Sequence, residues 1–279
     1  MAYNDTWARQ IVSDEQYVAI PDDLRRIYER DAGAGFASSS MLIYCPRTDR
    51  WRSYLSEKLI YLREKSLYYI ERADQGLIRR VFDAKNIYAL EAGHILLDSW
   101  ITIAGRDGDQ SDMVIIYFNR TVYKAFERII TMLRAYALGL DFPAPFDNRL
   151  STVLEKKNFK YMNYARDLIF QAENPIACYV YQKAISKKAF KIFNVSLTND
   201  HVALLSKDEV IHLSEGRKMI ERYGIVKTFY IRRHMDRSEY SEDEESGNLQ
   251  ITLSAGLFKR VLYFDPVNKR DAIALIKRI

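Results

Sequence analysis

Residues 261–279 read VLYFDPVNKRDAIALIKRI, and an earlier stretch of the chain repeats their pattern. A short apolar run is followed by Asp265 and Pro266, which are typical of a helix start, and then by an amphipathic helix. Residues 115–134, IIYFNRTVYKAFERIITMLR, have the same order, with Asn119 in the capping place of Asp265. Two such strand–helix endings in one chain predict a duplicated domain.

Short apolar runs separated by turn residues precede both endings. They are rich in Tyr, Ile and Leu, as is typical of an antiparallel β barrel or sandwich. We expect strands at 41–45, 51–55, 58–62, 66–71, 79–90, 94–105 and 113–118, then at 177–182, 190–197, 201–206, 209–215, 222–234, 248–255 and 260–264. Each set is followed by one helix, over 119–138 and 265–279. The sequence thus predicts a mainly β protein with capping helices.

The domain boundaries follow from this repeat. Residues 1–140 are expected to hold an N-terminal helix and the first domain, and residues 174–279 the second domain. Between them, residues 141–173 read as a linker, broken by Pro143 and Pro145, and a helix.

This order of seven strands and a C-terminal helix, present twice, resembles tandem bacterial pleckstrin-homology-like domains. The resemblance covers roughly residues 38–138 and 174–279 and rests on strand order and the closing helices. It implies two seven-stranded antiparallel barrels or sandwiches, each closed at one corner by its helix. It implies no catalytic residues and no cofactor.

Composition and motifs narrow the class of protein. A hydrophobic content of 48% with 28% charged residues is that of a globular protein. Residues 1–10 lack the pattern of a signal peptide, and the two cysteines, Cys45 and Cys178, have apolar or aromatic neighbours. We therefore expect a cytoplasmic protein with reduced thiols. No phosphate loop, serine elbow or zinc motif occurs, which favours a non-enzymatic protein.

The four histidines are spread along the chain. His201 and His212 fall on consecutive expected strands, so their side chains can approach each other. Without a third ligand nearby they do not predict a metal site.

Basic residues point to one candidate anion-binding site. The net charge of +5 arises in the second half of the chain. There, the first hairpin of the second repeat carries Lys183, Lys187, Lys188 and Lys191 around its expected turn, and the matching hairpin of the first repeat carries Arg47, Arg50 and Arg52. Such side chains can hold phosphate oxygens by charge-assisted hydrogen bonds. The acidic residues 236–247 are expected to form a mobile loop, which could cover the basic hairpin.

The function expected from the sequence is that of a binding or scaffold protein that acts through protein–protein contacts, with a partner protein still to be identified. The alternative is peripheral attachment to an anionic phospholipid membrane through the basic hairpin of the second domain. Nucleic acid is not an expected partner, because no recognition motif places the aromatic residues on a basic surface. The sequence leaves open whether copies of the chain form a homo-oligomer.

Overall fold

The structure is a computed structural model. It describes residues 8–33, 41–50, 53–95, 98–143, 159–166, 168, 176–189, 193–215, 224–236, 238–243 and 246–279.

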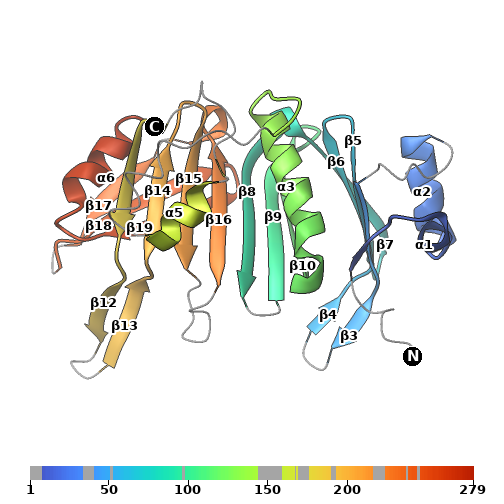
Figure 1. Ribbon diagram of the computed structural model, residues 1–279, viewed down its shortest axis with the longest axis horizontal. Coiled ribbons are helices and arrows are strands. Elements are labelled where there is room, and N and C mark those ends of the chain that lie inside the picture. Colours follow the sequence, from blue (N-terminus) through green and yellow to red (C-terminus); the bar gives the residue numbers. More distant parts are fainter. Residues whose placement is uncertain are drawn as a thin grey trace.

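Antiparallel strands dominate both halves of the chain (Figure 1). The first half contains β1 (Arg9–Gln10), α1 (Asp14–Val18), α2 (Asp22–Ala32), β2 (Met41–Cys45), β3 (Thr48–Arg50), β4 (Ser53–Leu55), β5 (Lys58–Arg63), β6 (Ser66–Ala73), β7 (Gly76–Asp83), β8 (Ile87–Ile95), β9 (Asp98–Asp107), β10 (Gln110–Asn119) and α3 (Tyr123–Ala137). The second half contains α5 (Phe159–Arg166), β11 (Cys178–Gln182), β12 (Ile185–Ala189), β13 (Phe193–Thr198), β14 (His201–Leu205), β15 (Glu209–Glu215), β16 (Ile225–Ile231), β17 (Glu239–Glu242), β18 (Leu249–Ala255), β19 (Phe258–Phe264) and α6 (Lys269–Ile276). Among the described residues, 3-10 turns join elements at η1 (Ala84–Asn86), η2 (Arg120–Val122) and η4 (Arg232–His234).

The two halves have the same strand order. In the first half, β2, β5, β6 and β7 pair consecutively, and so do β8, β9 and β10. In the second half, β11, β14, β15 and β16 pair consecutively, as do β17, β18 and β19. A two-stranded hairpin is inserted after the first strand of each set, β3–β4 and β12–β13, and each set ends in a helix, α3 or α6. Even the 3-10 turn after the fourth strand is repeated, as η1 and η4.

The halves are joined by strand pairing. β8 pairs antiparallel with β16, so that the second sheet of the first half and the first sheet of the second half form one seven-stranded sheet, β10-β9-β8-β16-β15-β14-β11. In the described part of the chain neither half closes into a barrel, which corrects the barrel form of the expected barrels or sandwiches. Pairing between the halves satisfies the edges of β8 and β16, whereas β7 and β17 remain at the edges of their sheets among the described residues.

Two of the expected strands were wrong. Residues 79–90 do not form one strand, because η1 separates β7 from β8 and the side chain of Asp83 accepts a hydrogen bond from the N–H of Lys85 (3.0 Å). Residues 94–105 also belong to two strands, since β8 ends at Ile95 and β9 begins at Asp98. Each of these two expected strands therefore combined parts of two neighbours. The strand expected over 222–234 was too long, since β16 ends at Ile231 and residues 232–234 form η4.

Both closing helices begin later than expected. Asn119 Oδ1 accepts from the N–H of Thr121 (3.0 Å) and caps η2, which leads into α3. Asp265 Oδ1 accepts from the N–H of Asn268 (2.9 Å), so it caps a turn, and α6 starts only at Lys269. Both side chains thus cap a turn after the last strand and not the helix itself, which corrects their expected role as helix N-caps and the helix starts at 119 and 265. Of the helix expected between the two domains, the structure describes α5.

The acidic segment 236–247 is also corrected in part. Its residues Glu239 to Glu242 form β17, an exposed edge strand paired with β18, where a mobile loop was expected. Glu242 forms an ion pair with Lys269 of α6, and the N–H of Asp236 donates to the carbonyl of Ser254 (3.0 Å). These contacts hold the segment against β18 and α6.

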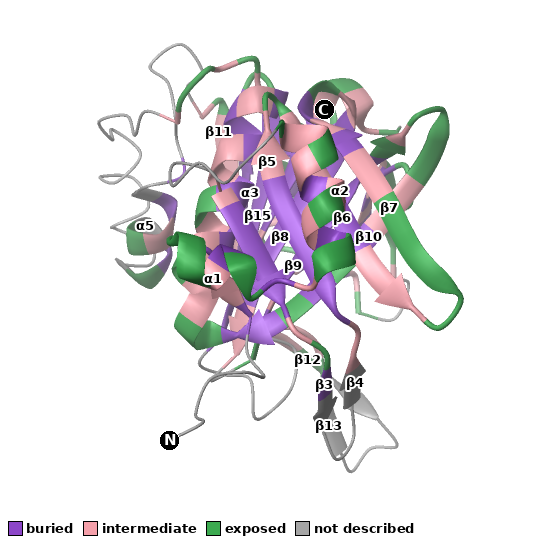
Figure 2. Ribbon diagram, turned by 90° about the vertical axis from the view of Figure 1, so that its right-hand side faces the viewer, coloured by how far each residue is buried: buried purple, intermediate pink, exposed green. Residues whose placement is uncertain are grey.

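Buried residues are concentrated in the strands of the sheets (Figure 2), and they form three hydrophobic clusters among the described residues. Helix α3 packs Phe126 and Ile130 onto the seven-stranded sheet, and α6 packs Leu275 and Ile276 into the core of the second half. Helices α1 and α2 cover the outer face of the five-stranded sheet, β1-β2-β5-β6-β7. The four helix residues are buried as expected.

Candidate functional site

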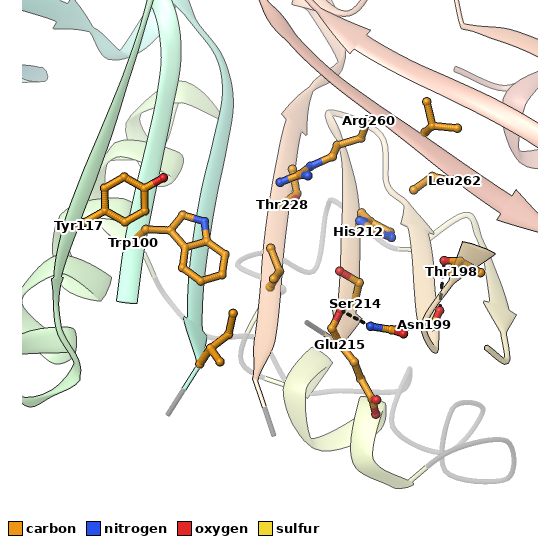
Figure 3. Close-up of a pocket in the computed structure, with 13 residues that line it drawn as sticks. Trp100, Tyr117, Thr198, Asn199, His212, Ser214, Glu215, Thr228, Arg260 and Leu262 are labelled. Atoms are coloured by element: carbon orange, nitrogen blue, oxygen red, sulfur yellow. Dashed lines mark hydrogen bonds between the residues drawn. The ribbon is translucent and has the colours of Figure 1, made fainter. Parts of the chain in front are cut away.

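A cavity of about 400 Å³ lies where the two halves meet (Figure 3). One wall comes from the first half, with Trp100 of β9 and Tyr117 of β10. The other wall comes from β15, β16 and β19, with His212, Thr228 and Arg260. The pairing of β8 with β16 brings these walls together, so the cavity exists only because the halves share one sheet.

Glu91 lies at the centre of a polar network beside this cavity. The residue is 2% exposed, and its carboxylate accepts from Trp100 Nε1 (2.9 Å) and Thr228 Oγ1 (3.1 Å). Arg260 of β19 forms an ion pair with the same carboxylate. Because an unpaired buried carboxylate is very unfavourable, these three partners are needed for Glu91 to occupy the junction. The Glu91 carboxylate thereby connects Trp100 of the first half to Thr228 and Arg260 of the second half.

Gly93 sets the position of the Trp100 ring. A Cβ atom at Gly93 would lie 2.2 Å from Trp100 Cζ2, well inside contact distance. Gly93 and Trp100 are direct partners in the β8–β9 pairing. The absence of a side chain at residue 93 thus lets the indole lie over the strand, with its N–H directed at Glu91.

An apolar strip borders the cavity on β10. It consists of Ile115 and Tyr117, whose exposed fractions are 41% and 55%. β10 is one of the two end strands of the seven-stranded sheet in the described part of the chain. Exposed apolar side chains next to a cavity and a strand edge are a common feature of surfaces that bind other proteins.

His201 and His212 approach each other as expected, with ring centroids 5.3 Å apart. Burial lowers the pKa of His201 to about 4, and its Nδ1 lies 3.1 Å from the carbonyl oxygen of Asn199. Because a carbonyl only accepts, Nδ1 carries the proton of a neutral ring. Within the described residues no group of three or more His, Cys, Asp or Glu side chains is placed to hold a metal ion.

The opposite face of the sheet has a second cavity, of about 610 Å³, between α3 and β16. Lys227 and Glu127 form an ion pair at its wall, with Nζ 3.1 Å from Oε1. Arg134 and Glu209 form a buried pair there, with Nε 2.8 Å from Oε2. These pairs connect α3 of the first half to β15 and β16 of the second.

The basic residues predicted to bind an anion are only partly described. Lys183 and Arg47 are exposed and precede the hairpins β12–β13 and β3–β4, respectively. Lys187 and Lys188 lie on β12, which corrects the expectation of a turn at 183–188, and Arg50 ends β3. The side chains of Lys187, Lys188 and Arg50, and the whole of Lys191 and Arg52, lie outside the described residues.

The junction residues were not predicted from the sequence. Glu91, Thr228 and Arg260 are far apart in the chain, and none belongs to a motif. The one available signal was Glu91 itself, a carboxylate within the apolar run of residues 87–95. A charged residue in a buried strand requires a partner, although the sequence does not say which.

Comparison with known proteins assigns the chain to no family. No protein-family profile matches the sequence, and no curated protein matches it. Among the described residues no helix is long and apolar enough to cross a lipid bilayer.

Proposed function

We propose that this protein is a non-enzymatic scaffold of two pleckstrin-homology-like units that binds a partner protein at the junction between them. The repeated order of four paired strands, three paired strands and a helix supports the two units. The pairing of β8 with β16 and the buried ion pairs across the junction support a rigid arrangement of these units. A rigid junction offers a partner a preformed surface at low entropic cost.

The observation that carries the proposal is the apolar strip beside the cavity. An extended segment of a partner, lying along the free edge of β10, would form main-chain hydrogen bonds with that strand. Its apolar side chains would contact Ile115 and Tyr117, and one of them could enter the cavity next to Trp100. Aromatic side chains of this kind often contribute most of the binding energy at protein interfaces.

Site-specific photocrosslinking in the source cells tests this proposal. A benzophenone amino acid at residue 117 should give one discrete protein adduct, and Trp100→Ala should reduce that adduct. The same probe at Phe142, which is 75% exposed and does not line the cavity, is the matched control. If residue 117 gives no protein adduct, or only the adducts found at residue 142, the junction is not a protein-binding site.

A second candidate function, attachment to an anionic membrane, is favoured by the placement of the two hairpins. The hairpins β3–β4 and β12–β13 project from the same side of the molecule in both views (Figures 1 and 2). Lys183 and Arg47, at the base of these hairpins, are exposed. A flat anionic surface could therefore meet both hairpins at once.

Co-sedimentation with vesicles that contain phosphatidylserine tests this candidate. Replacing Lys183, Lys187, Lys188 and Lys191 by Gln should weaken binding by about 4 kcal/mol, or about a thousandfold, at roughly 1 kcal/mol per lysine. The control variant replaces four exposed lysines elsewhere, Lys124, Lys207, Lys259 and Lys277, and changes the net charge equally. Equal binding by both variants would place the contact elsewhere. A wild type that does not sediment at low salt would exclude membrane attachment.

A further inference from the structure

The two strands that pair at the internal junction, β16 and β8, each have an equivalent strand in the other half of the chain. β16 is the fourth strand of its half, and its equivalent in the first half is β7, because each is followed by a 3-10 turn. β8 is the first strand of its three-stranded set, and its equivalent is β17. Within the described residues, β7 and β17 are edge strands, whereas β8 and β16 pair with each other.

We propose that β17 of one copy of this chain pairs antiparallel with β7 of a second copy, in the way that β8 pairs with β16. This inference deepens the proposed scaffold function, and it rests on that function only for the equivalence of the two units. The interface is heterologous, since two different edges meet. Repetition therefore gives a ring if the rotation closes and an open filament if it does not.

The register of the internal junction can be transferred to this interface. Glu91 pairs with Thr102 and Thr228, and Glu239 pairs with Thr252, the residue of β18 equivalent to Thr102. Glu239 therefore takes the place of Glu91. Arg80 precedes η1 by the same number of residues as Thr228 precedes η4, so Arg80 is the equivalent of Thr228.

The transferred register sets Glu239 of one copy opposite Arg80 of the next, and Tyr240 opposite Arg79. The first is a pair of opposite charges in direct cross-strand contact, and the second brings a guanidinium beside an aromatic ring. Tyr240 is 52% exposed, and the side chains of Arg79 and Arg80 are 41% and 25% exposed.

The edge strands β17 and β7 also differ in the charge of their side chains, which suits a contact between two different edges. β17 carries two glutamates and only exposed side chains. β7 carries two arginines, and its residues Leu77 and Ile78 are 37% and 38% exposed. Arg79 and Arg80 also form ion pairs with Asp31 and Asp112 of their own chain, but both keep partly exposed guanidinium groups at this edge. Two β17 edges would instead bring like charges together, so that β17–β17 pairing is disfavoured.

Sedimentation velocity of the full chain over a range of concentrations tests the proposal. The wild type should form species larger than a dimer at low salt. Glu239→Arg and Arg80→Glu should each weaken association by about tenfold through like-charge contacts. A 1:1 mixture of these two variants should restore it, since each new side chain then faces an opposite charge.

Two controls keep the outcomes distinct. Lys124→Glu changes the net charge as much as Arg80→Glu but lies on the exposed face of α3, and it should associate like the wild type. Arg80 has an ion pair with Asp112, so its variant could lose stability, whereas the exposed Glu239 can be replaced without that effect. Association that Glu239→Arg does not change, or that the mixture does not restore, would overturn the proposal. A monomeric wild type that still gives the adduct at residue 117 would overturn it and leave the proposed function intact.

Discussion

Arg134 of α3 and Glu209 of β15 form an ion pair across the junction of the two halves, with Nε 2.8 Å from Oε2. Both side chains are almost fully buried, with exposed fractions of 2% and 3%. The guanidinium also lies 4.3 Å from the centre of the Phe229 ring and donates to the carbonyl of Leu168. One side chain of the first half is thus enclosed by groups of the second half.

Breaking this pair should destabilise the whole chain. Arg134→Met leaves the Glu209 carboxylate buried without its cation, and the free energy of unfolding should fall by about 3–5 kcal/mol. Urea denaturation measures this loss. The exposed pair Lys65–Asp141 is the control, and Lys65→Met should leave the free energy of unfolding nearly unchanged. The double variant Arg134→Met, Glu209→Met should recover part of the loss. A single-variant loss no larger than that of the control would contradict the account.

Phe126 is predicted to be one of the main stabilising residues of α3. It is fully buried and stacks on Phe118, with ring centroids 3.8 Å apart. Phe126→Ala should lower the free energy of unfolding by about 3–5 kcal/mol, because it leaves a cavity under the helix. Phe142→Ala, at an exposed position, should change it by less than about 0.5 kcal/mol. A loss below about 1 kcal/mol for Phe126→Ala would mean that α3 lies outside the core.

Gly93→Ala should disturb the junction cavity through Trp100. The new methyl group would overlap the indole, and overpacking of this kind costs about 1–3 kcal/mol. In a Trp100→Ala background the same substitution should cost less than about 1 kcal/mol, since the clash is removed. Denaturation of the four proteins of this cycle measures the difference. An equal cost in both backgrounds would show that the ring does not lie over residue 93.

Stability should fall between pH 7 and pH 5 in part because of His201. Burial lowers the pKa of the folded His201 to about 4, below its ordinary value of 6.5. Between these values the unfolded state binds a proton that the folded state does not, so the free energy of unfolding decreases as the pH falls. By pH 5 this loss is about 2 kcal/mol. Denaturation at each pH should give a flatter profile for His201→Gln, and parallel profiles would contradict the prediction.

Local patterns predicted many of the strands correctly. The runs at 41–45, 58–62, 201–206 and 209–215 have the apolar character and flanking turns of strands, and each is one. The matched endings at Asn119 and Asp265 led to the repeated order, because both side chains cap the chain after the last strand. Neighbouring residues determine these features, so the sequence displays them.

Features that depend on long-range pairing could not be predicted. The β8–β16 pairing joins residues on either side of the centre of the chain, and no local pattern records such a partner. Glu91 and Arg260 meet only because of it. The break at η1 was missed for a different reason, since Val81, Phe82, Ile87 and Tyr88 look like one continuous strand when the capping bond of Asp83 is not known.

Hydrogen exchange of the backbone amides in β8 and β16 tests most directly the central claim, that the two halves form one body through a shared sheet. The account predicts that amides of residues 89–94 and 225–230 belong to the slowest class and exchange only through global unfolding. The exposed edge strand β17 provides the internal comparison and should exchange faster. If β8 and β16 exchange as fast as β17, the halves are separate units and the junction cavity is not a stable site.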